Sequence, residues 1–469
     1  MERELRDRAA AAHVTDLVDL WAELDGDERT VCFERLATEG HNLHPCGRTR
    51  LGWGVDDLLA HDLESPVTSL AFLAVQRELH VGDEVAPALL GPDYPSRLDP
   101  RRYVVTPVHP WQRRHVLAGH FAGLVADGAL MPLDVEVPAQ VTAALRTLLV
   151  AGGAGDAQPA GIRFVKLSLD IQVTSTRRTI SVASTRNGPA LSRLLPRLIA
   201  DDRVLLMAEP AGSAVVARGR DRDLAAIVRR GVADRLGPGE IAVPAAAMPA
   251  RSPLGSTGRT VVAELVDRFA RTRAIPARPA AALAFVAEYA ALLLPPVLRL
   301  ATRHGIALEA HLQNCLPTFV DGVPHRLALR DLAGMRVHLP RLGDQLTAEL
   351  NLWPGSVIAT TDLDVMRAKV GYTALQAHLA EIVIALQRSH GLDETCAWRA
   401  VRSTVDEIYE DLGREPGLAE PARADHAFLT AATVPHKALL TMRLRSAAGQ
   451  PGDHYLPIAN PLHGRMKPW

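Results

Sequence analysis

The sequence predicts an α+β fold, with strands in the middle of the chain and helices toward both ends. Apolar residues recur at helical spacing in residues 10–38, and helical patterns return in residues 343–450. Between them, apolar and polar residues alternate in residues 163–182, as they do in strands with one buried face. With 469 residues, the chain is long enough for two or three domains with sizeable cores.

The composition excludes several classes of protein. The formal net charge is −1 and 22% of residues are charged, so no basic field favours nucleic acid. The four cysteines form no CxxC pair, which argues against a thiolate zinc site or a disulfide framework. The longest apolar run, 280–294, contains Glu288 and ends at two prolines, which favours a buried helix over a membrane span. Residues 1–13 do not resemble a signal peptide. We therefore expect a cytoplasmic protein with no nucleic-acid or membrane partner.

The remaining elements follow from local patterns. Residues 66–80 are predicted to form an amphipathic helix, and residues 103–115 a short strand followed by a rigid turn set by prolines. Two helices are expected at about 260–273 and 280–303. Residues 237–256 are rich in Pro, Gly and Ala, which indicates a domain boundary or a mobile loop.

A glycine-bounded loop at residues 40–54 carries His44, Arg48 and Arg50. In an extended segment, Arg48 and Arg50 would face the same side, and two neighbouring guanidiniums repel unless an anion bridges them. A carboxylate or a phosphate is the natural bridge, and a solvated loop is the alternative.

Lysine is rare in this chain, and Lys166 opens the strand region. Only Lys166, Lys369, Lys437 and Lys467 are lysines among the 52 basic residues. The strand pattern places Lys166 at the start of a polar row that runs toward Arg177 and Arg178. A solvated strand face would give the same pattern, so periodicity leaves both interpretations open.

The segment Arg303–Asn314, RHGIALEAHLQN, concentrates chemistry in a few residues. If it is extended, Glu309, His311 and Gln313 point the same way, which suits a site better than a core. Asp331 follows in the predicted strand and turn ALRDLAGMR. A hydrogen-bonded structural histidine is the alternative for His311.

Taken in order, these stretches resemble the IucA/IucC family, the NRPS-independent siderophore (NIS) synthetases. The resemblance rests on HPCGRTRLG from His44, Ala144-Leu145-Arg146-Thr147, Lys166-Leu167, Thr174-Ser175-Thr176-Arg177-Arg178, GIALEAHLQN, Arg330-Asp331, and the FhuF-like segment VPHKALLTMRL.

The resemblance implies a fold shaped like a cupped hand, with antiparallel sheets flanked by helices. It implies a shortened, thumb-like region with the HPxxRxRxG loop at 1–100, a fingers-like ATP-binding region at 101–240, and a palm-like region with a helical FhuF-like end at 241–469. A homodimer is a further expectation.

It also implies an ATP-dependent ligase that adenylates citrate or a citrate derivative with Mg²⁺ and condenses it with an amine, hydroxylamine or alcohol. Its products would include AMP and pyrophosphate. Catalysis is expected from His311, Arg178 and Lys166, and metal binding from Glu309 and Asp331. ATP would be bound by His44, Arg146, Thr147, Lys166, Gln313, Asn314 and Asp331. The substrates would be bound by Arg48, Arg50, Thr174, Arg178, His311, Lys437 and Arg443.

Three departures from the family pattern keep alternatives open. Arg48 stands where lysine is common, Ala144 stands where serine is usual, and the first motif begins early in the chain. The alternatives are the same chemistry on a non-citrate acid in another natural-product pathway, or a non-catalytic homologue that binds a siderophore or polycarboxylate. A metal-dependent hydrolase is disfavoured, because no HExxH motif is present.

Overall fold

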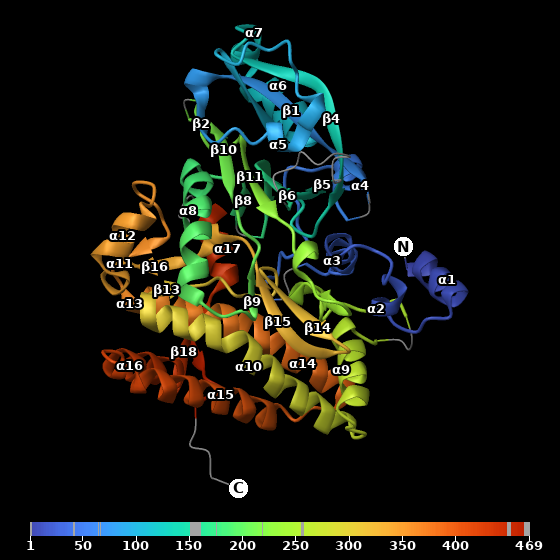
Figure 1. Ribbon diagram of the computed structural model, residues 1–469, viewed down its shortest axis with the longest axis vertical. Helices are drawn as coiled ribbons and strands as arrows, with labels where there is room; N and C mark the ends of the chain where they lie inside the picture. The colour runs from blue at the N-terminus through green and yellow to red at the C-terminus, as the bar shows by residue number, and fades with distance from the viewer. Residues whose placement is uncertain are drawn as a thin grey trace.

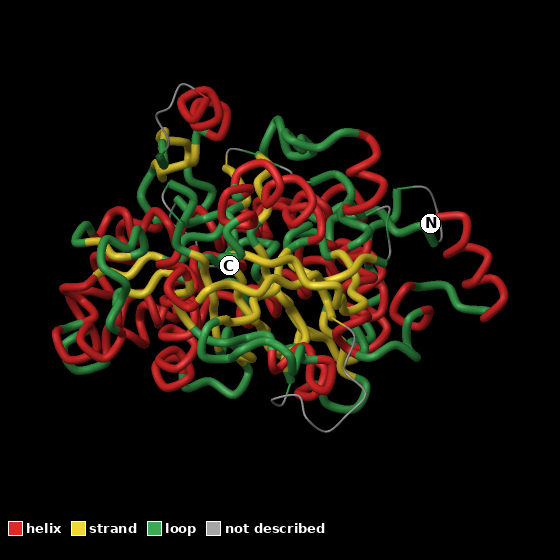
Figure 2. Tube along the Cα trace, turned by 90° about the horizontal axis from the view of Figure 1, so that it is seen from above, coloured by secondary structure: helices red, strands yellow, loops and turns green. Residues whose placement is uncertain are grey.

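The computed structural model describes residues 2–40, 43–63, 65, 67–150, 161–174, 176–217, 219–254, 258–447 and 452–463. A lobe built on one large sheet lies above a lobe rich in helices (Figure 1). Viewed from above, the strands run through the middle of the molecule with helices around them (Figure 2). The α+β class predicted from the sequence is confirmed.

The upper lobe is an eight-stranded sheet in which every neighbouring pair is antiparallel. Its order is β2 (His80–Gly82), β10 (Ala211–Val215), β11 (Ala225–Arg230), β6 (Ile162–Leu167), β5 (Thr147–Val150), β4 (Leu130–Val141), β1 (Thr68–Gln76) and β3 (Tyr103–Val108). The short helices α4 (Val55–His61), α5 (Pro87–Leu90), α6 (Ala118–His120) and α7 (Ala122–Ala126) belong to this lobe.

The prediction of a helix at residues 66–80 is wrong, because most of this segment, Thr68–Gln76, is the strand β1 and a short 3₁₀ turn, Arg77–Leu79, follows it. Residues 70–75 are all buried, on both faces of the strand. A continuous apolar run lacks the alternation of a half-exposed strand, so periodicity cannot distinguish it from a buried helix.

The lower lobe packs helices against a four-stranded sheet. The sheet order is β12 (Glu240–Ala242), β14 (Cys315–Val320), β15 (Val323–Leu329) and β9 (Val204–Leu206), with β15 and β9 parallel. The surrounding helices include α9 (Val261–Thr272), α10 (Arg278–His304), α14 (Ala380–His390), α15 (Glu394–Arg414) and α16 (Ala419–Leu429). The two helices predicted for 260–303 are therefore confirmed.

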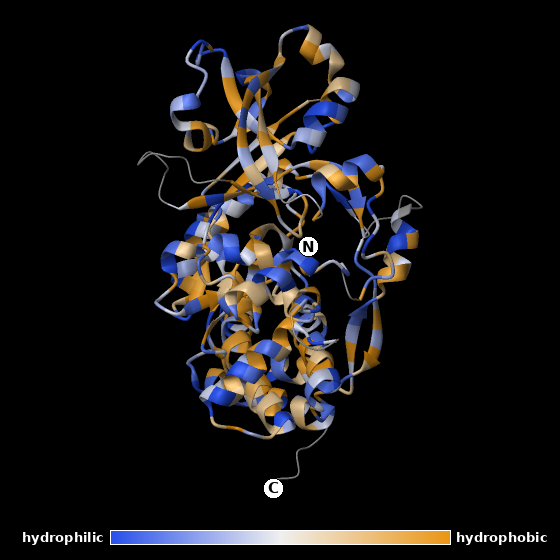
Figure 3. Cartoon of the chain, turned by 90° about the vertical axis from the view of Figure 1, so that its right-hand side faces the viewer, coloured by the Kyte–Doolittle hydropathy of each residue, from blue (hydrophilic) through white to orange (hydrophobic). Residues whose placement is uncertain are grey.

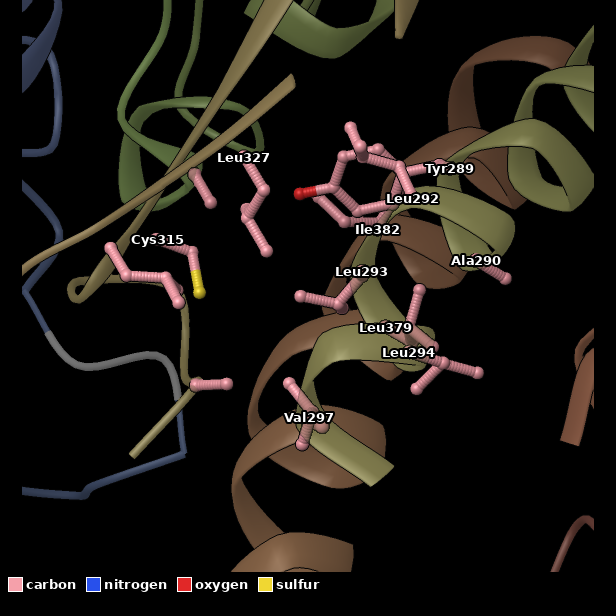
Figure 4. Packing of buried hydrophobic residues seen from close by; sticks show 14 of the residues in the cluster. Tyr289, Ala290, Leu292, Leu293, Leu294, Val297, Cys315, Leu327, Leu379 and Ile382 are labelled. Carbon is pink, nitrogen blue, oxygen red and sulfur yellow. The ribbon is translucent and has the colours of Figure 1, made fainter. Parts of the chain in front are cut away.

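Helix α10 is the central element of the lower core. Tyr289, Leu293 and Val297 face Leu379, Ile382 and the strand residues Cys315 and Leu327 (Figure 4). Among the described residues, α10 alone is long and apolar enough to cross a bilayer, but 72% of its apolar window is buried inside the protein. Hydrophobic residues are spread over the strands of the upper lobe as well as the lower helices (Figure 3).

The Pro/Gly/Ala-rich segment at 237–256 is packed structure rather than a linker, which corrects the prediction. Ala245, Ala247 and Met248 belong to the lower core. The Val243 amide bonds to the Pro317 carbonyl at 3.0 Å, and the Ala246 amide to the Leu312 carbonyl at 3.0 Å. Small residues permit this close backbone approach. Residues 255–257 lie outside the described residues.

Smaller elements complete the chain. The N-terminal helices are α1 (Glu2–Ala12), α2 (Leu17–Leu20) and α3 (Gly26–Glu34), and α8 (Val182–Ile199) runs alongside both lobes. Two hairpin sheets pair β7 (Leu169–Val173) with β8 (Thr176–Arg178), and β18 (Thr433–Lys437) with β19 (Tyr455–Ala459). A third small sheet joins β13 (Ile306–Ala307), β16 (Arg336–His338) and β17 (Ala359–Thr360). Further helices are the π-helical η3 (Gln112–Leu117), α11 (Leu339–Leu342), α12 (Asp344–Leu350), α13 (Leu363–Val370), the π-helical η7 (Gly371–Leu379) and α17 (Leu439–Ala447), together with short 3₁₀ turns.

Candidate active site

A cavity lies where the upper sheet meets the lower lobe. Residues of both lobes line it, including 143–147, 311–313, and Val173, Thr174 and Arg178. Many of the predicted site residues are among those that line it: Arg50, Arg146, Thr147, Lys166, Thr174, Arg178, His311, Gln313 and Asp331. Residues far apart in the sequence therefore meet at one cavity.

The upper wall of the cavity is formed by strands that carry cations. Thr147 of β5 is paired with Lys166 of β6, and partners in an antiparallel ladder project from the same face. The Arg146 guanidinium donates Nη1 hydrogen bonds to the carbonyls of Arg178 at 2.7 Å and Thr179 at 3.1 Å. Arg146 thus fixes the end of β8, and with it the position of Arg178.

These cations are held in an environment that disfavours their charge. Burial lowers the pKa of Lys166, although Asp331 opposes this, and burial also lowers the pKa of Arg146. Burial and the neighbouring Arg146 lower the pKa of Arg178 to about 10. Clustered, desolvated cations repel one another, so an anionic ligand entering the cavity would be stabilised there.

The lower wall is a loop rather than the extended segment expected for residues 303–314. Only Ile306–Ala307 is a strand, and the chain turns where the Asn314 amide bonds to the His311 carbonyl at 3.0 Å. The loop carbonyls are bound by helices instead of a neighbouring strand. His378 Nδ1 donates to the Ala310 carbonyl at 2.9 Å, and the Tyr289 hydroxyl donates to His378 Nε2 at 2.7 Å.

The position of His311 is therefore determined by the lower core. Ala310 precedes it, and Tyr289 and His378 are both fully buried. Burial lowers the pKa of His311, with Glu309 opposing the shift, so the imidazole is biased toward its neutral form.

Asp331 connects the two lobes by charge. It follows β15 of the lower sheet, and its Oδ1 accepts a hydrogen bond from Lys166 Nζ on the upper sheet. Its Oδ2 lies 3.9 Å from Nη2 of Arg229, which is also on the upper sheet. Burial alone would raise the pKa of Asp331, but Lys166, Arg229 and Arg146 hold it well below its usual range. The carboxylate is ionised at neutral pH.

Glu309 is paired within the lower lobe. Its Oε1 accepts from Lys369 Nζ, and its Oε2 lies 3.4 Å from Asn314 Nδ2 and 3.9 Å from His311 Nε2. Burial favours the neutral acid, yet Lys369 and His311 lower the pKa of Glu309 overall. Gly334 leaves room for this carboxylate, because a Cβ there would overlap Oε2.

The donor chemistry of Glu309 and Asp331 fits Mg²⁺. Hard carboxylate oxygens suit this ion, which is commonly bound by one or two carboxylates together with substrate phosphates. Within the described part of the chain, no group of three or more His, Cys, Asp or Glu residues could hold a metal ion. Phosphate oxygens would therefore have to supply further ligands.

Other predicted residues lie beside the cavity or outside it. His44 is buried, and its pKa is lowered by burial and by Arg443 and Arg178, so these side chains are neighbours. Lys437 Nζ bonds to Asp453 Oδ1 at 2.8 Å and lies over the ring of Tyr372. Within the described residues, His44, Arg48, Glu309, Asn314, Lys437 and Arg443 are not among the lining residues. Ser175 of the sequence motif lies outside the described residues.

The prediction that an extended backbone places Arg48 beside Arg50 is wrong. The Gly47 amide bonds to the His44 carbonyl at 2.9 Å and the Thr49 amide to the Cys46 carbonyl at 3.2 Å, so the loop turns. Arg48 is exposed, whereas Arg50 Nε bonds to Asp62 Oδ2 at 2.9 Å. A carboxylate of the protein thus already neutralises Arg50.

Sequence reasoning missed several charged residues around the site. Lys369, Arg229 and Glu209 are buried and paired with one another or with predicted site residues. The scarcity of lysine was a signal for Lys369. Arg229 and Glu209 gave no signal, because one lies near the end of an apolar strand and the other lies in a loop.

Comparison with known proteins agrees with this arrangement. Residues 29–250 match the IucA / IucC family, and residues 283–452 match the family described as ferric iron reductase FhuF-like transporter. The chain is 24% identical to D-ornithine–citrate ligase of Staphylococcus aureus, over 92% of this chain and 70% of that protein. It is 27% identical to staphyloferrin A synthase of the same organism, over 89% of this chain and 70% of that protein.

Solved structures show the same fold. The petrobactin biosynthesis protein AsbB of Bacillus anthracis superposes with a TM-score of 0.76 at 21% identity, covering 98% of this chain and 78% of that one. ATP-bound aerobactin synthetase IucA of Klebsiella pneumoniae gives a TM-score of 0.76 at 20% identity, covering 99% of this chain and 82% of that one. The motifs and the two family matches together identify residues 29–250 as a segment of the IucA/IucC family and residues 283–452 as an FhuF-like segment.

Proposed function

We propose that the protein is an ATP-dependent ligase of siderophore biosynthesis that activates a carboxylate, of citrate or a citrate derivative, as an acyl adenylate. An amine, hydroxylamine or alcohol then attacks the acyl carbon. The observation that carries this proposal is the convergence of Arg146, Lys166, Arg178 and His311 on one cavity. A nucleoside triphosphate and a polycarboxylate bring many negative charges together, and such a site requires several fixed cations.

In the first step, a carboxylate oxygen of the acid attacks the α-phosphorus of ATP, and pyrophosphate leaves. Arg146, Thr147 and Lys166 would hold the phosphates from the upper wall, with His44 beside them. Gln313 and Asn314 would contact the nucleotide from the lower loop. For Lys166 to reach a phosphate oxygen, its bond to Asp331 must be shared or exchanged.

Arg178 and His311 would bind the acid, since they line the cavity from opposite walls. In the second step, the nucleophile attacks the acyl carbon, the nucleophile loses a proton, and AMP leaves. Arg178 and His311 would stabilise the negative charge that develops on the acyl oxygen. Loss of a donor with this role typically costs about 10²–10³ in rate.

Glu309 and Asp331 would bind Mg²⁺, which when bound would neutralise phosphate charge. Both acids are ionised, and each is already paired with a lysine, so the site keeps its charge balance before the substrates arrive. Asp331 would present its carboxylate to the phosphates held by Lys166.

The identity of the substrates rests on the relatives. The names of similar proteins specify citrate with D-ornithine, and citryl-spermidine with spermidine. We therefore propose citrate or a citryl monoamide as the acid and a polyamine or a basic amino acid as the nucleophile. The homodimer and the cytoplasmic location stay predictions from the sequence.

Product analysis tests the proposal. Purified protein is incubated with ATP, Mg²⁺, citrate and an amine such as ornithine or spermidine, and nucleotides and pyrophosphate are quantified. The proposal expects AMP and pyrophosphate in equal amounts with a citryl amide. Formation of ADP and phosphate would contradict adenylation. Binding of citrate with no ATP consumption under any amine would favour a non-catalytic binding protein.

A further inference from the structure

A buried ion pair stands behind the site, between Glu209 and Arg229. Arg229 Nη2 donates to Glu209 Oε1 at 3.1 Å, and both side chains are shielded from solvent, with the arginine at 3% and the glutamate at 0% exposure. Glu209 lies in the loop between β9 and β10, and Arg229 lies near the end of β11. A buried ion pair typically stabilises a protein no more than apolar residues of similar volume would. Stability alone therefore does not explain why this pair lies beside the cavity.

The structure builds a fixed place for Glu209. Its backbone amide donates to Ser192 Oγ on α8 at 2.7 Å. Gly188, one turn earlier on α8, leaves space for the carboxylate, because a Cβ there would lie 2.5 Å from Oε2. Any larger residue at position 188 would displace Glu209. The position of Arg229 is thereby set by α8 as well as by its own strand.

Sheet geometry directs Arg229 toward the site. Ile227 of β11 is paired with Lys166 of β6, so their side chains share one face. Arg229 follows Ile227 by two residues and projects from the same face. Arg229 Nη2 consequently approaches Asp331 Oδ2 at 3.9 Å, while Lys166 bonds to the other oxygen, Oδ1.

Asp331 needs such support. Its backbone adopts a left-handed conformation, with φ of 66°, which is uncommon for a residue other than glycine. Its bond to Lys166 is the one that phosphate binding would disturb. Once Lys166 turns to a phosphate, Arg229 on β11 still faces the other carboxylate oxygen, Oδ2.

We propose that Arg229, held by Glu209, is a positioning residue that keeps the Asp331 carboxylate aimed into the cavity when Lys166 engages the triphosphate, and so preserves the oxygen that binds Mg²⁺. This inference rests on the proposed function. Neither Glu209 nor Arg229 would touch the substrate; the pair would act through Asp331.

Calorimetric titration of ATP, with and without Mg²⁺, tests the inference on the full-length protein. The variants are Arg229→Met, the charge-balanced double variant Glu209→Gln/Arg229→Met, and the control Arg230→Met. Arg230 is the next residue on the same strand and is exposed. Thermal unfolding of each variant is measured in parallel.

The expected result is a selective loss of the Mg²⁺ effect. In Arg229→Met, the gain in ATP affinity on adding Mg²⁺ falls about tenfold, as is usual when a residue supporting a metal ligand is lost. Binding of ATP without Mg²⁺ stays within about twofold of wild type. The midpoint of thermal unfolding, lowered in Arg229→Met by the unpaired Glu209, returns toward the wild-type value in the double variant. The gain in ATP affinity on adding Mg²⁺ does not return. Arg230→Met behaves as wild type in both measurements.

Two results would overturn the inference while leaving the ligase proposal intact. One is an unchanged Mg²⁺ effect in Arg229→Met. The other is recovery of the Mg²⁺ effect in the double variant, which would make the pair a matter of charge balance alone. Absence of ATP binding by the wild-type protein would overturn the ligase proposal itself, and is therefore distinguishable.

Discussion

The two walls of the cavity are built in different ways. The upper wall is built on strands: Thr147 and Lys166 are placed by the register of β5 and β6, and Arg146 directly precedes β5. The lower wall consists of loops, with His311 and Asp331 placed by bonds to helices and to the opposite lobe. Strands fix a row of cations, and loops bring acids, amides and an imidazole to face it.

The proposed function gives the two walls different tasks. A row of guanidinium and ammonium groups on a rigid sheet suits the repeated charges of a triphosphate. A mixed set of side chains on supported loops suits the carboxylate and the reacting acyl group. The predictions below separate the two tasks.

The largest effect is expected at His311 on the lower wall. His311→Ala should leave the fold intact and reduce adenylate formation below detection, because the acid loses a contact that positions its carboxylate for attack on the α-phosphorus. The measurement is acid-dependent exchange of pyrophosphate into ATP. His325→Ala, an exposed histidine on β15, is the matched control. Unchanged exchange in His311→Ala would remove His311 from the site.

Lys369 tests whether the lower wall depends on its buried ion pair. Its side chain is 4% exposed and its ammonium bonds to Glu309. Lys369→Met should therefore reduce the free energy of unfolding by about 3–5 kcal/mol, because the Glu309 carboxylate is left without its partner. Denaturant unfolding measures the change.

Two comparisons sharpen this result. Adding Glu309→Gln to Lys369→Met should restore most of the stability, since no unpaired charge then remains. Lys437→Met, which breaks a more exposed pair with Asp453, should cost far less. Equal losses in Lys369→Met and Lys437→Met would mean that the Glu309 pair has no special place in the lower wall.

Lys166 tests the upper wall. Lys166→Ala should weaken ATP binding by about 10- to 100-fold, the effect of losing a charged hydrogen bond to phosphate, and should weaken binding of the acid much less. Isothermal titration with each ligand separately measures both. A greater loss for the acid than for ATP would mean that the two walls have exchanged tasks.

The smallest effect expected is on acid stability. His109 in the upper lobe and His378 in the lower lobe are fully buried, and burial lowers their pKa values to about 3 and about 4, from 6.5. A histidine that is buried in its neutral form contributes fully to the free energy of unfolding above pH 6.5, the pKa of the unfolded chain. This contribution is lost as the pH falls from 6.5 toward the lower pKa of the folded state, because the unfolded chain then binds a proton that the folded protein does not. The loss between pH 7 and pH 5 is about 2 kcal/mol for each residue.

The two histidines differ in their partners, which makes the pH test informative about each lobe. His378 bonds through both ring nitrogens, whereas Nε2 of His109 has no partner among the described residues. His109→Phe should therefore remove part of the acid sensitivity with little loss at pH 7. Unfolding curves between pH 5 and pH 8 measure this, and an unchanged pH dependence in His109→Phe would contradict it.

Much of the site could be predicted from sequence because its motifs are local. Arg146-Thr147, Lys166-Leu167 and the segment 309–314 each carry chemistry within a few residues, and their meeting at one cavity follows from the fold. The helices at 261–272 and 278–304 were predictable because a long stretch of apolar residues at helical spacing is typical of a helix packed against a core.

The rest depended on contacts between distant segments. Strand β1 is buried on both faces, so its sequence lacks the alternation of apolar and polar residues that would have identified a strand. The small residues of 237–254 are typical of a linker, although they are packed in the lower core. The pairing of Arg50 with Asp62, Lys369 with Glu309, and Arg229 with Glu209 cannot be inferred from spacing, because the partners come together only in the folded chain.

Trapping the acyl adenylate with excess hydroxylamine tests most directly whether this cavity activates a carboxylate with ATP. Wild-type protein and His311→Ala are each assayed with ATP and Mg²⁺ against citrate, succinate, 2-oxoglutarate and citryl monoamides. The account predicts an ATP-dependent hydroxamate with citrate or a citryl monoamide for the wild-type protein, and none for His311→Ala. Equal hydroxamate formation by both proteins, or none with any acid although ATP is bound, would contradict it.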